Sequence, residues 1–395
     1  MTSFHLNKEQ FGWAVSAFAC AYALFEIPSG MWGDRIGQRS LFIRIVLCWS
    51  LFTALTGVTI GLTSLIVVRF LFGVGEAGAW PNGTAALSRW MPAKETSRGT
   101  SSMQIGGAMG NALAPIIIVP IAVAFGWRMP FFVIALFGIL WVLVCVFWFK
   151  NNPSEKKNIS QNEKDYIERN RRIENQQHRL SWRVVFKNKN LLFLPLCYFC
   201  CMCGWTFFVY WLPVYVQDGL HFSENETKSL TSLIYVAGAI SAFTIGIFSD
   251  WLVKKRGLKF GRRFVGITCL SIAAMMFFST VITTNSAVIV TCLCIAFFFI
   301  SSDAMTSWST SIDIGGNHVG AVAGMMNTGG QVGGILIGIV VGKLVNISHS
   351  YTSSLFAVAT VLGCGALLWL LVDPTKKLVV EDKRQVRDWD IMPTV

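Results

Sequence analysis

The sequence carries little charge for its length. Of its 395 residues, 14% are Asp, Glu, Lys or Arg, whereas soluble domains carry roughly 25%. Histidine is scarce too: the five histidines are scattered over expected loops and helix ends. No Ser/His/Asp set, phosphate-binding loop or metal-ligand spacing occurs, and the first nine residues have no signal-peptide pattern. These absences argue against a soluble protein and against an enzyme.

Cysteine offers no metal or redox motif either. Most of the 11 cysteines lie within apolar segments, and four of them cluster over residues 197–203. No histidine or acidic residue stands beside this cluster to complete a metal site. We therefore interpret these cysteines as small packing residues on a helix and expect neither a metal nor a cofactor.

Long apolar segments are what the chain has in abundance, since 53% of its residues are hydrophobic. A membrane-spanning helix needs roughly 20 apolar residues, and lipid offers no partner to an unpaired peptide group. The sequence therefore predicts an all-α membrane protein of about eleven transmembrane helices. The expected spans are 10–33, 41–60, 64–88, 99–122, 129–149, 191–216, 228–250, 264–283, 286–311, 319–342 and 353–372.

The positive charges indicate an orientation. A net charge of +12 and 33 Lys plus Arg residues could also indicate nucleic-acid binding. If the loop after residue 33 is cytoplasmic and the sides then alternate, 28 of those 33 residues fall on the cytoplasmic side. Because basic loops stay in the cytoplasm, we expect a multi-pass protein of the cell membrane with a cytoplasmic C-terminus, and no nucleic-acid partner.

One long polar stretch, 150–190, divides the chain. Ser160 and Glu163 form a capping-box pattern that predicts a short surface helix over 161–177. The expected organisation is an N-terminal bundle of five helices at 1–149, a cytoplasmic loop at 150–190, a C-terminal bundle of six helices at 191–373 and a cytoplasmic tail at 374–395.

The two halves repeat one another. Residues 30–39 match the glycine, aspartate and arginine pattern of 246–263, and 106–110 resemble 329–333. Arg39 and Arg262 are 223 positions apart, as are the two glycine-rich stretches. Duplicated membrane halves indicate a transporter with its site between them. This offset aligns the first span with the second span of the C-terminal half, so the first helix of the N-terminal half is expected to be missing.

Family motifs accompany the repeat. Residues 30–39 fit the pattern G-x-x-x-D-R-x-G-x-R and resemble the signature loop between helices 2 and 3 of the major facilitator superfamily. Residues 69–81 are similar to helix 4 of its anion:cation symporter family, whose nearest-looking members carry galactonate, glucarate and hexuronates. The resemblance implies a major facilitator fold of two pseudo-symmetric bundles. It also implies a monomer in the lipid bilayer that performs proton-coupled symport of a small organic anion by alternating access.

Other readings stay open at this point. The missing helix carries an acid–arginine pair in the family, so the alternatives include a truncated, transport-inactive membrane protein or a substrate sensor. Within transport, an anion exchanger or a Na⁺-coupled carrier is the alternative. Gly107 stands where galactonate-type relatives have glutamine, and Gln104 lies about one turn earlier.

An acid inside a span is the first candidate for proton coupling. Glu76 is costly when charged and unpaired in a membrane, and intramembrane acids are proton-relay candidates; the resemblance places a coupling glutamate here. Arg69 precedes it by seven residues, on roughly the same helix face. Arg69 either pairs with Glu76, attracts anions or snorkels outward. Glu26 and Asp303 rank lower because the resemblance assigns them no role.

The resemblance also implies a substrate site and a gate. The expected substrate-binding residues are Tyr22, Gln104, Tyr210, Ser307, Trp308 and Asn327. The expected gating residues are Asp34, Arg35, Arg39, Asp250 and Arg262. In the family the loop aspartate faces the N-terminus of a helix from the other half, where the helix dipole favours an anion by roughly 0.3–1 kcal/mol.

Overall fold

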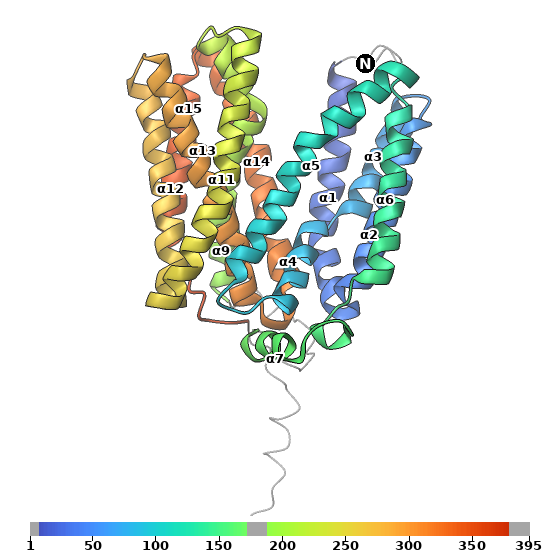
Figure 1. Cartoon of the computed structure of the whole chain (residues 1–395). Coiled ribbons are helices and arrows are strands. Elements are labelled where there is room, and N and C mark those ends of the chain that lie inside the picture. Colours follow the sequence, from blue (N-terminus) through green and yellow to red (C-terminus); the bar gives the residue numbers. More distant parts are fainter. Residues whose placement is uncertain (1–7, 172–187, 379–395) are drawn as a thin grey trace, which may run out of the picture.

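The computed structural model describes residues 8–171 and 188–378, and within these ranges it contains helices but no strands. The helices form two groups that stand beside each other (Figure 1). We call the first group the N-terminal bundle. It comprises α1 (Lys8–Ile36), α2 (Gln38–Gly57), α3 (Leu62–Glu76), α4 (Ala79–Trp90), α5 (Thr96–Phe125) and α6 (Met129–Trp148).

The second group, the C-terminal bundle, follows a polar connection. The connection contains the 3₁₀ turn η1 (Pro153–Glu155) and the helix α7 (Gln161–Asn170). The bundle comprises α9 (Asn190–Thr206), η2 (Phe207–Trp211), α10 (Leu212–Val214), η3 (Tyr215–Gly219), α11 (Glu224–Arg256), α12 (Leu258–Ile282), α13 (Ser286–Gly315), η4 (Gly316–His318), α14 (Val319–Ser348) and α15 (Thr352–Leu368).

The surface helix begins as the capping box predicts. The Ser160 hydroxyl accepts a hydrogen bond from the Glu163 backbone N–H at 3.2 Å, which caps the start of α7. The helix ends at Asn170, earlier than the expected end at 177. Positions 172–177 lie outside the described residues.

The helices have the length and composition of membrane spans. Among the described residues, seven stretches are apolar and long enough to cross a bilayer, and one of them, Ser286–Ser348, holds both α13 and α14. Two shorter apolar stretches are Ile116–Phe125 and Thr352–Leu368. Large apolar side chains face outward, with Phe147 80% and Val123 83% exposed. Such a surface fits lipid and not water.

One expected span is in fact two helices. The sequence predicts a single segment over 64–88, but α3 ends at Glu76 and α4 begins at Ala79. Gly78 between them has φ +90°, a left-handed conformation that other residues rarely adopt. A Cβ at this position would also collide with the Ser29 side chain of α1. The break therefore allows α4 to pack closely against α1.

The loop expected at 34–44 is also mostly helical. The first helix continues through Asp34 to Ile36, and the second begins at Gln38 after one connecting residue. That residue, Gly37, has φ +88°. A one-residue turn of this kind depends on glycine, and it fixes Asp34 firmly at the end of a helix instead of leaving it in a loop.

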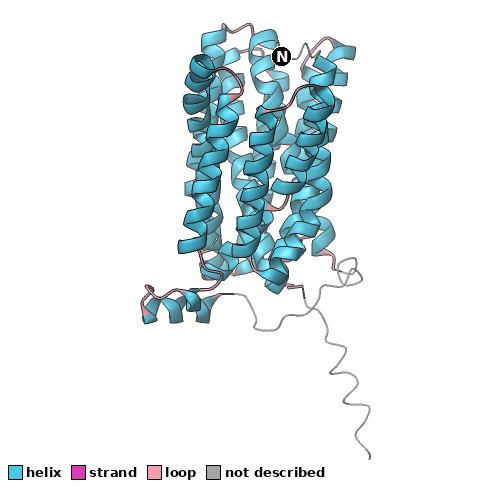
Figure 2. Cartoon of the chain, turned by 90° about the vertical axis from the view of Figure 1, so that its right-hand side faces the viewer, coloured by secondary structure: helices cyan, strands magenta, loops and turns pink. Residues whose placement is uncertain are grey.

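The two ends of the molecule differ in how the bundles meet. We call the end at which α7 lies the α7 end, and the end at which α1 begins the opposite end (Figure 1). Seen from the side, the long helices run between these two ends, and connections lie at both (Figure 2). The ribbons of the two bundles converge at the α7 end, where α1 packs against α14 and α5 against α11.

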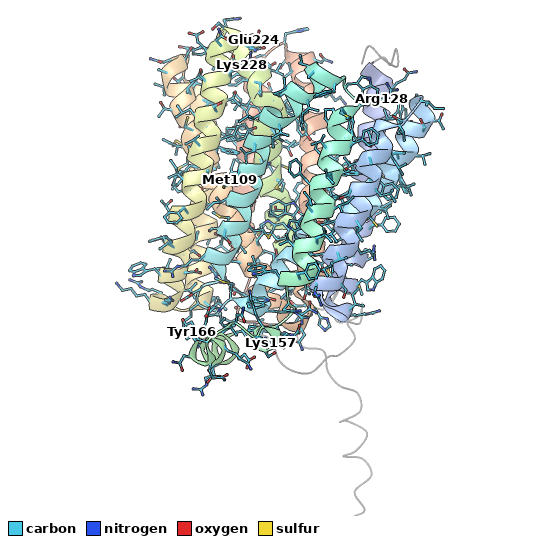
Figure 3. The ribbon with its side chains drawn as sticks, turned by 45° about the vertical axis from the view of Figure 1, so that its right-hand side comes forward. Met109, Arg128, Lys157, Tyr166, Glu224 and Lys228 are labelled. Carbon is cyan, nitrogen blue, oxygen red and sulfur yellow. The ribbon has the colours of Figure 1, made fainter. Side chains whose placement is uncertain are left out.

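The C-terminal bundle contains a helix, α9, that has no counterpart within residues 8–171. In the C-terminal bundle α9 packs against α14, and a Cβ on Gly330 would lie 2.5 Å from the Tyr198 ring. Small residues at such positions let helices approach closely. On α5 the matching face is uncovered: Gly106 and Gly110 have no heavy atom within 4 Å of a Cβ position, and Met109 is 59% exposed (Figure 3). Within residues 8–171, no helix takes the place that α9 has in the other bundle.

Candidate functional site

Asp34 joins the two bundles at the α7 end. One carboxylate oxygen accepts a hydrogen bond from the Gly320 N–H at 2.9 Å, and the other accepts one from the Ala321 N–H at 2.9 Å. These N–H groups belong to the first turn of α14, where no intrahelical acceptor exists and the helix dipole favours an anion. Gly30 allows the contact, because a Cβ there would overlap the Gly320 carbonyl oxygen.

Asp250 makes the reciprocal contact. Its carboxylate accepts hydrogen bonds from the backbone N–H groups of Ser97 at 3.2 Å and Arg98 at 3.1 Å, in the first turn of α5. Each bundle thus offers one aspartate from the α7-end part of a helix to the start of a helix in the other bundle. The two aspartates are the pair that the sequence repeat aligns, which supports the duplication.

Arg262 completes a buried polar cluster around Asp250. Its side chain is 0% exposed; Nε donates to Asp313 at 2.8 Å, and Nη1 lies 3.3 Å from the Asp250 carboxylate. It also donates to the hydroxyls of Ser97 and Thr96 on α5, the latter at 2.6 Å. One arginine therefore links α11, α12 and α13 to the N-terminal bundle.

The other two arginines of the predicted gate do not cross between the bundles. The Arg39 guanidinium donates to the Val146 carbonyl at 2.5 Å, and its backbone N–H donates to Asn151 at 2.8 Å, both in the N-terminal half. Arg35 is exposed. Of the five predicted gating residues, the described interactions connect Asp34, Asp250 and Arg262 to the opposite bundle.

Asp34→Asn is expected to weaken the closed α7 end without unfolding the protein. The asparagine amide keeps the shape of the carboxylate, but it loses the charge and places its NH₂ donor against one of the two backbone N–H groups. Because hydrogen bonds to charged groups contribute about 1.5–3 kcal/mol, the contact with α14 is weakened. Transport should fall while expression and thermal stability change little. A large loss of folded protein with normal transport per folded molecule would show that the charge is structural.

A second layer of contacts between the bundles lies along α1, α4 and α14. The rings of Trp80 on α4 and Trp308 on α13 are 6.0 Å apart, and the Trp308 indole N–H donates to the Tyr198 hydroxyl at 3.1 Å. The Asn327 side chain on α14 donates to Glu26 on α1 at 2.5 Å. Trp308 and Asn327, both predicted to bind substrate, thus lie where the bundles meet.

Glu76 and Arg69 lie on α3 of the N-terminal bundle. Glu76 ends α3 beside the helix break and is partly exposed. It interacts electrostatically with Arg69 and with Tyr22 of α1. The interaction with Arg69 favours a pair between Glu76 and Arg69 over an arginine that attracts anions or snorkels outward. The Arg69 guanidinium also lies 5.8 Å from the centre of the Phe72 ring.

Three predicted substrate residues lie apart from the described contacts of this layer. The Ser307 side chain is 0% exposed, and its hydroxyl has no hydrogen-bond partner among the described residues. Gln104 is half-buried, and Tyr210 is 69% exposed. Ser307 directly precedes Trp308 on α13, but no described side-chain hydrogen bond or ring contact joins any of the three to Trp308 or Asn327.

Sequence reasoning missed two members of the layer. Tyr198 follows Cys197 in the cysteine-rich segment, which was interpreted as packing alone. Trp80 precedes Pro81 at the end of the helix-4 motif, and that position was the available signal for it. Neither aromatic could be assigned to an interface between the bundles before the bundles were placed.

Known proteins resemble this chain in sequence. The Major Facilitator Superfamily profile covers residues 1–338. A probable sulfoacetate transporter of Cupriavidus necator is 32% identical over 93% of this chain and 86% of its own length. The hexuronate transporter of Bacillus subtilis is 28% identical over 88% of this chain and 82% of its own length.

Solved structures agree on the fold. The transporter FucP in its outward conformation superposes with a TM-score of 0.71 at 15% identity, over 94% of this chain and 92% of its own. At that identity the likeness concerns the fold alone. Together with the sequence matches it makes this chain a membrane transporter and not an enzyme. The chain belongs to the major facilitator superfamily, among its sugar-acid and organic-anion transporters.

Proposed function

We propose that this protein is a proton-coupled symporter of a small organic anion, a sugar acid or a similar carboxylate, and that it works by alternating access. The bundles at 1–149 and 191–373 move against each other, and the anion and one proton are carried together. The observation that carries the proposal is the reciprocal pair of contacts from Asp34 to α14 and from Asp250 to α5. Such contacts hold one end shut and can break without unfolding either bundle.

The α7 end is the cytoplasmic end in this proposal. Lys157 and Tyr166 mark it in Figure 3, while Arg128, Glu224 and Lys228 lie at the opposite end. Basic residues concentrate at the α7 end, as expected of a cytoplasmic face. The structure then corresponds to a state whose cytoplasmic side is closed.

The middle layer provides the chemistry for the anion and the proton. Trp308 and Trp80 offer aromatic faces from opposite bundles, and Asn327 offers an amide beside them. Tyr22, Gln104, Tyr210 and Ser307 complete the proposed substrate set. Glu76 carries the proton, with Arg69 as its electrostatic partner.

Uptake into proteoliposomes tests the proposal. Labelled sulfoacetate, a hexuronate and galactonate are supplied with a pH gradient, acid outside, in separate vesicles. We expect accumulation of at least one anion, and collapse of that accumulation by a protonophore. Protein-free vesicles are the control. Accumulation driven by a Na⁺ gradient alone, or label exchange without accumulation, would contradict proton symport.

Binding without transport is the second candidate. The observation that favours it is the uncovered face of α5 at Gly106 and Gly110, against which no helix packs within residues 8–171. A transport-inactive protein or a sensor would bind an anion in the same layer. It would show ligand-dependent thermal stabilisation with neither accumulation nor exchange.

A further inference from the structure

Glu26 lies wholly buried in the contact between the bundles. Its side chain is 0% exposed, and its carboxylate accepts hydrogen bonds from Asn327 at 2.5 Å and Thr328 at 3.4 Å, both on α14. At Gly324, one turn earlier on α14, a Cβ would lie 3.3 Å from the Glu26 carbonyl oxygen. The opposite bundle therefore covers both the side chain and the backbone of Glu26.

Neutral groups surround this carboxyl. Tyr22 on α1 and Tyr198 on α9 are the titratable groups that interact with it electrostatically, and Tyr22 also interacts with Glu76. The charged groups of the other elements packed against α1 are engaged elsewhere or lie toward the ends of the molecule. They are Arg39 of α2 with Val146, Arg44 of α2 over Trp32, Arg69 of α3 with Glu76, Arg89 of α4 with Asp34, His318 of η4 at the start of α14 and Lys343 in the last two turns of α14.

The other buried acids have different surroundings. Asp303 is also 0% exposed, but its partners Trp369 and Cys201 belong to its own bundle. Asp250 and Asp313 are paired with Arg262. Among the described acids, only Glu26 combines neutral side-chain donors from the opposite bundle with the absence of a cation partner, since Asp250 accepts from Ser97 but is also paired with Arg262. Its surroundings must change when the bundles move, whereas those of Asp303 need not.

We propose that Glu26 is a proton latch of the α1–α14 contact: its carboxyl holds a proton while α14 covers it and releases that proton to water when the α7 end opens. This inference rests on the alternating access proposed above. A carboxylate that is removed from water without a cation is strongly disfavoured, whereas water admitted by opening solvates the ionised form. Closing thus takes up one proton and opening releases one as hydronium, leaving the carboxylate behind.

The latch differs from the proposed role of Glu76. Glu76 lies within the N-terminal bundle and is partly exposed, so it can exchange a proton while the α7 end stays closed. Glu26 can exchange its proton only when α1 and α14 separate, because α14 covers its carboxyl in the closed state. A proton on Glu26 keeps the empty protein closed at the α7 end, so opening waits until binding of the anion and of the transported proton favours it.

Distance measurements across the α7 end test the latch without relying on transport. Spin labels are introduced through non-natural amino acids at Ser40 and Arg256, exposed positions on α2 and α11. In the wild-type background the open-to-closed ratio should rise with pH, by up to about tenfold per pH unit for one linked proton. Glu26→Gln should remove this dependence and favour the closed form. Asp303→Asn, the matched control, should keep it.

A second variant guards against a folding failure. If Glu26→Gln does not fold, Asn327→Ala removes a donor that favours the ionised form in the closed state, so the rise of the open-to-closed ratio with pH should continue to higher pH than in the wild type. A folded Glu26→Gln protein with the wild-type pH dependence would overturn the latch. If its uptake were still proton-driven, the proposed symport would survive that result. A pH dependence abolished by Glu26→Gln, in a protein without proton-driven uptake, would support the latch and refute symport.

Discussion

Glu76→Gln is expected to abolish accumulation of the anion under a pH gradient while exchange of labelled for unlabelled anion persists. Glutamine mimics the protonated acid permanently, so it keeps the shape and hydrogen-bonding capacity needed for binding. It cannot release a proton on the cytoplasmic side. With a gradient of about two pH units, symport with one proton supports up to about hundredfold accumulation, and the variant should reach no accumulation at all.

The structure explains why this position suits proton exchange. Glu76 ends α3 directly before the Ala77–Gly78 break, it is partly exposed, and Arg69 interacts with its carboxylate. An intramembrane acid with access to water and one weakly engaged cation can alternate between its two forms. Asp303→Asn is the matched control, because that acid is enclosed within one bundle. Wild-type accumulation in Glu76→Gln would exclude the role and leave Glu26 or Asp303 as the coupling acid.

The helices were predictable because apolar length is a strong signal, but their ends were not. The span expected at 228–250 is observed as Glu224–Arg256. Its start is fixed by the Ser223–Glu226 capping box, and its last turn is basic. Hydropathy detects only the lipid-facing part of a helix and misses the polar turns that extend into the headgroup region. The break at Gly78 was missed for another reason: nothing in the sequence distinguishes a glycine that needs positive φ from its neighbours Gly73 and Gly75.

The contacts between the bundles at the α7 end were predictable only in part. Asp34 and Asp250 were found from a motif and a repeat. Both carboxylates accept hydrogen bonds from backbone N–H groups in the first turn of a helix of the other bundle. The repeat also aligns Arg39 with Arg262, yet their partners differ. Arg262 meets Asp313 and Thr96, which are 51 and 166 residues away. Such pairings depend on how helices pack in three dimensions, and a local pattern does not contain that information.

The contacts between the bundles described above run from the middle layer to the α7 end. Trp80 and Trp308 meet in the middle layer, Glu26 and Asn327 lie in the same layer, and Asp34 meets Gly320 at the α7 end. Aromatic contact tolerates sliding, whereas the charge-assisted bonds at the end have fixed directions. The α7-end bonds should therefore break first when this end opens.

Arg262→Met is expected to cause the largest loss of stability among single substitutions in the gate. The variant leaves Asp250 and Asp313 buried without their cation, and removing one partner of a buried ion pair costs about 3–5 kcal/mol. It also removes the donors to Thr96 and Ser97, so α5 loses two side-chain hydrogen bonds to the C-terminal bundle, while those of Thr100 and Ser101 to α13 remain. Thermal unfolding in detergent and the Ser40–Arg256 label distance measure the two consequences. Both a lower melting temperature and a wider α7 end are expected.

Arg263→Met is the matched control for this substitution. It lies next to Arg262 on α12 and donates to one neutral acceptor, the Val372 carbonyl, at 2.5 Å. A single hydrogen bond from a charged donor contributes about 1.5–3 kcal/mol, less than the loss expected for Arg262, so the control should unfold at a temperature between those of the wild type and Arg262→Met. Combining Arg262→Met with Asp250→Asn and Asp313→Asn should restore much of the lost stability, because the cost comes from uncompensated charge. The α7 end should remain loosened in this triple variant, since the Arg262 attachment to α5 is still absent. A triple variant as unstable as Arg262→Met would attribute the loss to packing of the arginine side chain instead of its charge.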